Sequence, residues 1–122
     1  MESKTKKQLK DEYKQMKFKA GVFAIRNIVN DKIFVSSSVN LDAIWNRHRL
    51  QLNFGAHPVS ELLSDWKLLG EDKFRFEILS EIKQNDEMTD KDIADEVKSL
   101  EKLYLEELQP YGDKGYNKPE KI

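Results

Sequence analysis

Two side chains in this sequence place a reactive group beside an apolar helix face. His48 shares its predicted face with Ile44 and Leu52, and a histidine there is either a hydrogen-bonded core residue or a proton-transfer group. Glu101 lies four residues after Val97, beside an apolar stripe rather than opposite it. A carboxylate in that position is either a metal ligand or a paired, half-buried anion. Spacing alone leaves both alternatives open at each position.

The other polar residues carry weaker signals. A serine run at residues 36–38 resembles a hydroxyl-rich phosphate loop, but no glycine accompanies it, so a turn and helix cap is the simpler interpretation. Asn117 is of a residue type that forms turns. His57 falls in a predicted loop and receives no role. Trp45 and Trp66 stand at helical spacing within apolar stripes and are expected in the core.

The composition indicates one globular domain without thiol chemistry. A chain of 122 residues is about one domain and can bury a substantial core. The sequence has no cysteine, which excludes disulfides, thiolate metal sites and cysteine nucleophiles. No apolar run approaches the ~20 residues that span a bilayer, and the charged N-terminus lacks the hydrophobic stretch of a secretory signal. We therefore expect a cytoplasmic protein with no membrane segment.

The net charge of −1 conceals an uneven distribution along the chain. Residues 1–26 hold eight basic side chains against three acidic ones, whereas residues 81–107 hold ten acidic side chains against four lysines. The basic segment could contact phosphates, although a solvated helix face is the simpler interpretation. The acidic C-terminal half argues against a broad nucleic-acid footprint.

Apolar periodicity and turn residues predict an α+β domain in the α/β class, with a small three-stranded antiparallel sheet flanked by helices. Asn30 and Asp31 tolerate positive φ and predict a two-residue hairpin turn. The predicted elements are a helix over 4–16, strands over 20–28 and 32–36, a helix from Ser38 or Asn40 to Gly55, a helix from Pro58 to Gly70, a strand over 74–82 and a helix over 90–108.

Several short motifs occur in order along the chain. They are Gly21-Val22-Phe23, Phe34-Val35-Ser36, Ser37-Ser38-Val39-Asn40, Trp45-Asn46-x-His48, Leu108-Gln109-Pro110 and Gly115-Tyr116-Asn117. Together with the element order, they resemble the GIY-YIG nuclease family over roughly residues 20–118. The chain looks closest to its short stand-alone members, some of which are labelled transcription regulators, although no helix-turn-helix is evident. We expect a basic N-terminal helix over 1–18 and a GIY-YIG-like domain over 19–122.

The resemblance implies hydrolysis of phosphodiesters with one divalent metal ion. In active members the two hairpin tyrosines lie near the scissile phosphate, and an arginine on the following helix stabilises the developing charge. A histidine one turn later assists proton movement. A glutamate on the last long helix holds the metal, and an asparagine near the end helps to position the site.

Three of these family positions are substituted in this chain. The tyrosines fall on Phe23 and Phe34, which keep the ring but have no hydroxyl to donate or accept a proton. The arginine falls on Ile44, which supplies no charge. Losing one such electrostatic group typically costs ~10²–10³ in rate. The three retained positions are His48, Glu101 as the metal ligand, and Asn117.

We therefore expect a GIY-YIG-fold protein with absent or strongly impaired phosphodiester hydrolysis that serves as a nucleic-acid-binding or regulatory module. The candidate nucleic-acid contacts are basic residues near the hairpin and on the helix that follows it, namely Lys19, Lys32, Arg47 and Arg49.

Two alternatives are retained. One is an active DNA endonuclease that uses Mg²⁺ or Mn²⁺ bound by Glu101, with His48 as acid or base and Arg47 or Arg49 replacing the missing arginine. The other is a protein-interaction module. A closed apolar cluster around both His48 and Glu101 would favour it.

Overall fold

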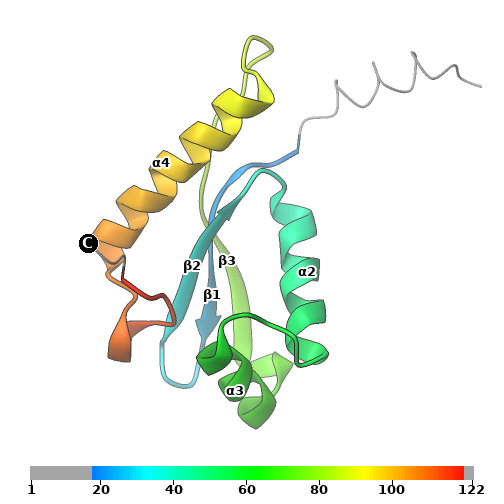
Figure 1. Cartoon of the computed structure of the whole chain (residues 1–122), viewed down its shortest axis with the longest axis vertical. Coiled ribbons are helices and arrows are strands. Elements are labelled where there is room, and N and C mark those ends of the chain that lie inside the picture. Colours follow the sequence, from blue (N-terminus) through cyan, green and yellow to red (C-terminus); the bar gives the residue numbers. More distant parts are fainter. Residues whose placement is uncertain (1–17, 120–122) are drawn as a thin grey trace, which may run out of the picture.

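The computed structural model describes residues 18–119. The predicted basic helix over residues 4–16 lies outside them. The described elements (Figure 1) are β1 Gly21–Asn27, β2 Ile33–Ser38, α2 Leu41–Asn53, α3 Ser60–Leu69, the short 3₁₀ helix η1 Glu71–Lys73, β3 Phe74–Glu81, α4 Asp90–Leu108 and the 3₁₀ helix η2 Gly112–Lys114. Among these, no helix has the length and apolar character needed to cross a membrane.

The three strands form one antiparallel sheet in the order β2-β1-β3, so β1 is central. Side chains alternate along β1. Phe23 and Ile25 join the core that α2 and α3 cover, whereas Val22 and Ala24 join the core that α4 covers. Figure 1 shows α2 and α4 on either side of the sheet. The predicted fold class is confirmed.

The hairpin between β1 and β2 is longer than predicted. Residues 28–32 connect the strands, so the two-residue turn at Asn30 and Asp31 is wrong, although Asp31 does adopt a φ of +63°. The reason is Asn27, whose side-chain oxygen accepts from Val29 N at 2.9 Å. Its backbone N–H donates to Lys32 O at 2.9 Å. An asparagine that bonds the chain two residues on stabilises its own turn, and this widens the loop.

The ends of α2 and α4 follow local capping chemistry. The Asn40 side chain accepts from Ala43 N, and Ser38 Oγ accepts from Asn40 N at 3.0 Å. A capping box formed by Thr89 and Asp92 begins α4. The turn-and-cap interpretation of the serine run therefore holds for Ser38. Side-chain acceptors of this kind satisfy helix N–H groups that have no intrahelical partner.

The predicted start of α3 at Pro58 is wrong by two residues, because α3 begins at Ser60 with Val59 as its N-cap. Val59 N donates to His57 Nδ1 at 3.0 Å. The imidazole ring of His57 thus closes the turn before the helix, a contact that the proline pattern does not reveal.

Beyond α4, the chain runs back along the outer edge of β2. Gly115 forms a parallel bridge with Ile33, and Tyr116 N donates to Ile33 O at 2.9 Å. A Cβ on Gly115 would overlap the backbone oxygens of Ile33 and Pro110. This close approach requires glycine and brings Asn117 beside the edge strand.

Candidate functional site

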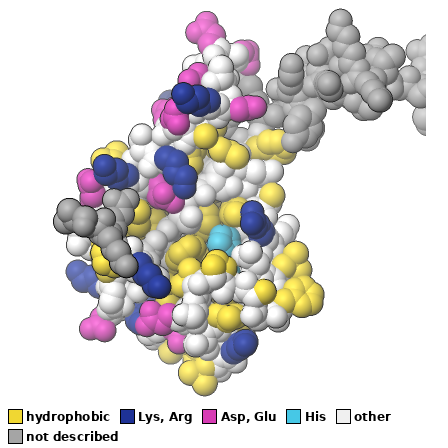
Figure 2. All heavy atoms as spheres, in the orientation of Figure 1, with side chains coloured by type: hydrophobic (Ala, Val, Ile, Leu, Met, Phe, Trp, Pro, Cys, Tyr) yellow, Lys and Arg dark blue, Asp and Glu magenta, His cyan; other side chains and the backbone are white. Residues whose placement is uncertain are grey.

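The two phenylalanines at the predicted tyrosine positions both pack against His48. The Phe23 and His48 ring centroids are 5.5 Å apart, and those of Phe34 and His48 are 5.8 Å apart. Phe23 is fully buried, whereas Phe34 is half-buried. In Figure 2, histidine surface lies in a hollow among hydrophobic side chains, with a basic side chain beside it. Here the molecule presents apolar rings and an imidazole.

Ile44 lies one helical turn before His48 on α2 and packs, partly buried, against the same core as Phe23. The residue at the predicted arginine position is therefore a packing residue. No positive charge is supplied at this point of the helix, where the resemblance implies one.

His48 does not stand alone. Its Nδ1 lies 2.8 Å from Nε2 of His57, which is only 5% exposed. Burial lowers the pKa of His48 to about 4, helped by positive charge at His57 and Arg47. Burial also lowers the pKa of His57. Both rings are therefore neutral at neutral pH.

Glu101 lies on the opposite side of the sheet from His48, on α4. Its Oε1 accepts from Ser37 Oγ at 3.2 Å, and its Oε2 lies 3.5 Å from Lys98 Nζ. The side chain is 17% exposed. Glu101 is thus a paired anion in this structure, and it remains partly open to solvent.

His48 and Glu101 reach the same strand from opposite faces, because His48 packs on Phe34 of β2 and Glu101 bonds Ser37 of β2. The surroundings of the two residues differ. His48 lies in an aromatic cluster, whereas Glu101 has a hydroxyl and an ammonium as neighbours. The closed apolar cluster that would favour a protein-interaction module therefore does not form around Glu101, and at His48 the aromatic cluster also includes His57.

Within residues 18–119, no group of three or more His, Cys, Asp or Glu side chains could hold a metal ion. Mg²⁺ nevertheless needs only one or two carboxylates, because water and substrate phosphate complete its shell. Glu101 is consistent with that limited role. Metal binding at Glu101 stays a prediction.

Asn117 clamps the outer edge of β2. Its Oδ1 accepts from Val35 N at 2.8 Å, and its Nδ2 donates to Val35 O at 2.8 Å. Both ends of the amide are occupied by backbone, so the side chain replaces a missing strand neighbour at this point. The simple turn expected for Asn117 does not describe these contacts.

Two of the four predicted basic contacts are already paired with acids. Lys32 Nζ lies 3.1 Å from Glu61 Oε1, and Arg49 Nε donates to Glu71 Oε1 at 2.9 Å.

The other two predicted contacts, Lys19 and Arg47, are exposed and form no ion pair within the described part of the chain. These two are therefore the better candidates for phosphate contacts.

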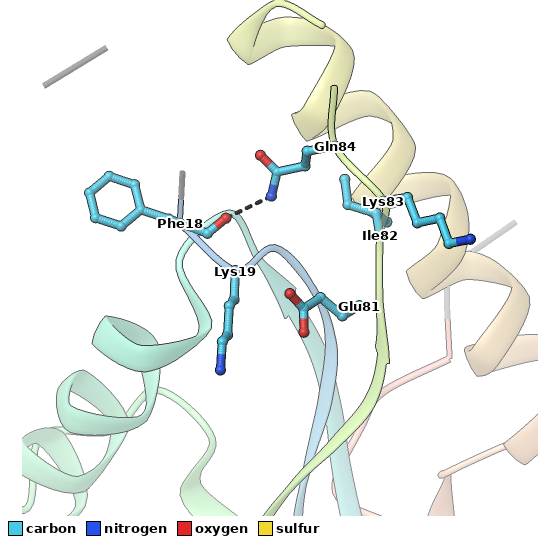
Figure 3. A pocket seen from close by; sticks show the side chains of 6 residues that line it. All are labelled: Phe18, Lys19, Glu81, Ile82, Lys83 and Gln84. Atoms are coloured by element: carbon cyan, nitrogen blue, oxygen red, sulfur yellow. Dashed lines mark hydrogen bonds between the residues drawn. The ribbon is translucent and has the colours of Figure 1, made fainter. Parts of the chain in front are cut away.

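Lys19 also borders a hollow of about 590 Å³ at one end of the sheet (Figure 3). Its lining is mixed in charge, with Glu81 and Lys83 among the residues, and Gln84 Nε2 donates to Phe18 O at 2.6 Å across it. Neither His48 nor Glu101 lines it. The hollow is thus separate from the predicted catalytic positions His48 and Glu101.

Three residues to which the sequence assigned no role in the site shape this region. His57 supports His48, and Ser37 binds Glu101. Tyr116 donates its hydroxyl to Asp65 Oδ2 at 2.6 Å. Burial, with that hydrogen bond, raises the pKa of Tyr116 to about 12, so this tyrosine stays protonated and does not replace the missing hairpin hydroxyls as a base. One signal for His57 existed, because it is the only other histidine in the chain.

The fold matches catalytic domains of endonucleases. One is the catalytic domain of the homing endonuclease I-TevI, with a TM-score of 0.66 and 27% sequence identity, covering 83% of this chain and 99% of that one. Another is a point mutant of the catalytic domain of the intron endonuclease I-TevI, with a TM-score of 0.67 and 27% identity, covering 82% of this chain and 93% of that one. No curated protein sequence matches.

The family model described as the GIY-YIG catalytic domain matches residues 19–117. The chain therefore belongs to the GIY-YIG family. The predicted resemblance is confirmed, over nearly the range expected from the motifs.

Proposed function

We propose that this chain is a nucleic-acid-binding or regulatory member of the GIY-YIG family in which phosphodiester hydrolysis is absent or strongly impaired. The observation that carries the proposal is the packing of Phe23 and Phe34 against His48. Rings without hydroxyls occupy both positions where the family places tyrosines.

Phosphodiester hydrolysis at this site would lack two kinds of catalytic group. Phenylalanine neither donates nor accepts a proton, and Ile44 contributes packing instead of charge. Stabilising the charge that develops on a phosphate is usually the largest catalytic contribution, so its loss costs about 10²–10³ or more in rate. His48 is neutral at neutral pH and brings no compensating charge.

Nucleic acid is the proposed ligand because the family and the I-TevI domains are nuclease domains. Lys19 and Arg47 support it, since both are exposed and free of ion pairs within residues 18–119. Lys32 and Arg49 are weaker contributors, because each already has a carboxylate partner.

The proposal is tested by nicking of supercoiled plasmid with Mg²⁺ or Mn²⁺, with Glu101→Ala as the matched variant. We expect no more nicking by the unsubstituted protein than by the variant, while both retard a DNA duplex in a gel. Nicking that disappears with Glu101→Ala would overturn the loss of hydrolysis. Failure to retard either DNA or RNA would overturn nucleic-acid binding.

A second candidate function is an active endonuclease that uses a divalent cation. Its support is Glu101, whose carboxylate is retained and partly exposed at β2. When bound, the ion would supply Lewis-acid stabilisation at the phosphate.

In that case Glu101 would hold the ion, and His48 would act as acid or base. Arg47 is the better of the two replacement arginines, because Arg49 is engaged with Glu71. Loss of plasmid nicking in Arg47→Gln, with Arg49→Gln unaffected, would support this alternative.

A further inference from the structure

The buried histidine pair carries information about where its protons lie. His57 Nδ1 accepts a hydrogen bond from Val59 N at 3.0 Å. A neutral imidazole carries one N–H and one acceptor nitrogen. Because Nδ1 of His57 is the acceptor, its single proton is on Nε2.

The position of the proton on His57 determines the position of the proton on His48. Nε2 of His57 lies 2.8 Å from Nδ1 of His48. With the proton on His57 Nε2, His57 donates and His48 accepts. The proton of a neutral His48 is then on its own Nε2.

The free nitrogen of the pair reaches solvent. Within residues 18–119, His48 has one hydrogen bond, at Nδ1, and no buried side-chain nitrogen or oxygen of these residues lacks a partner. Nε2 of His48 is therefore accessible. Phe23 and Phe34 contact the ring and restrict its tilt.

We propose that His57 is a positioning residue that fixes His48 in its Nε2–H form, so that His48 offers a neutral hydrogen-bond donor to a phosphate oxygen. The ligand part of this inference rests on the proposed function. In this arrangement His48 has no free lone pair with which to take a proton from water. Val59 N donates to His57, and His57 donates to His48. This series of hydrogen bonds leaves the Nε2–H of His48 as the group that binds phosphate.

Two variants of His57 separate its two hydrogen bonds. In His57→Gln, the side-chain amide NH₂ takes the place of Nε2 and still donates to His48 Nδ1. In His57→Asn, the amide oxygen takes the place of Nδ1 and still accepts from Val59 N, but the side chain is too short to reach His48. Both keep one of the two bonds, and thermal unfolding confirms whether each folds.

Two-bond ¹H–¹⁵N NMR correlations report the tautomer of each histidine directly. We expect both rings as Nε2–H in the unsubstituted protein, His48 still as Nε2–H in His57→Gln, and a mixture of tautomers for His48 in His57→Asn. Inorganic phosphate should shift the His48 Nε2–H resonance in the first two proteins.

Binding of a short DNA duplex gives the functional outcome. Apparent affinity falls with the fraction of molecules in the binding-competent tautomer, so His57→Asn, with a mixture of tautomers, should bind about twofold more weakly, and His57→Gln should bind about as tightly as the unsubstituted protein. A proton on His48 Nδ1 in the unsubstituted protein would overturn the positioning role. The expected tautomers together with no binding of DNA, RNA or phosphate would instead overturn the ligand role and the proposed function.

Discussion

At the scale of single residues, His48 shows how a polar ring is kept inside an aromatic environment. Its Nδ1 is hydrogen-bonded to His57, and its ring packs at steep angles against Phe23 and Phe34. Satisfying the one buried nitrogen removes the main cost of burial. The same burial makes the His48 ring difficult to protonate.

The first prediction concerns pH. Burial chiefly lowers the pKa of His48 from 6.5 to about 4, and burial lowers that of His57 in the same direction. The unfolded chain binds protons first as pH falls, so stability is complete above about pH 6.5 and decreases toward pH 4. We expect the free energy of unfolding to drop by about 1–2 kcal/mol between about pH 7.5 and pH 5, allowing for solvent screening of a partly exposed ring.

Urea denaturation across that pH range measures the effect. His48→Gln is the control, because it removes one of the two titrating rings and should make the pH dependence of stability smaller. Carboxylates remain largely ionised over this window, so they contribute little. The same pH profile for both proteins would contradict the prediction.

A second prediction separates the two hairpin phenylalanines. Phe23 is fully buried, so the hydroxyl of Phe23→Tyr enters the core and should cost about 1–3 kcal/mol of stability. Phe34 is half-buried, and the hydroxyl of Phe34→Tyr can reach water at a cost below about 0.5 kcal/mol. Chemical denaturation of both variants provides the comparison, and equal costs would show that the two sites are equivalent.

At the scale of elements, the edge strand β2 depends on the tail that follows η2. The Asn117 amide forms hydrogen bonds with both the backbone N–H and the backbone C=O of Val35. The backbone N–H of Tyr116 donates to the C=O of Ile33. An unpaired strand edge is a template for pairing with other chains. The tail covers this part of the edge.

We therefore predict that Asn117→Ala destabilises the fold by about 1–3 kcal/mol, because it leaves two backbone groups of β2 without their partner. Lys118→Ala is a matched control at the next position, where the side chain is exposed, and should change stability by less than about 0.5 kcal/mol. Thermal unfolding distinguishes the two. An unchanged unfolding temperature for Asn117→Ala would mean that water replaces the amide at no cost.

The elements themselves were largely predictable from the sequence, because their apolar periodicity and caps are local. The range 90–108 predicted for the last helix is the range of α4. The hairpin turn was not, since the side chain of Asn27 competes with the expected two-residue turn. His57 was also missed, because its partner His48 lies on a different element and no local pattern records a contact across a loop.

At the scale of the whole molecule, ion pairs engage part of the positive charge among residues 18–119. Lys32 and Arg49 are paired with Glu61 and Glu71, and Lys98 on the acidic helix α4 lies beside Glu101. The other two predicted contacts, Lys19 and Arg47, form no ion pair within residues 18–119. Nucleic-acid binding should consequently depend more on Lys19 and Arg47 than on the paired Lys32 and Arg49.

The salt dependence of DNA binding tests this distribution. Each phosphate contact that is lost lowers the slope of log K against log salt by roughly 0.9, so Arg47→Gln and Lys19→Gln should each reduce it by about that amount. Lys32→Gln is the matched control, because Glu61 already neutralises that ammonium and little counterion is released there. Fluorescence anisotropy of a labelled duplex at several salt concentrations gives the slopes. Equal reductions for Arg47→Gln and Lys32→Gln would show that the Lys32–Glu61 pair opens on binding, and that pairing in the free protein does not decide which cations meet the phosphates.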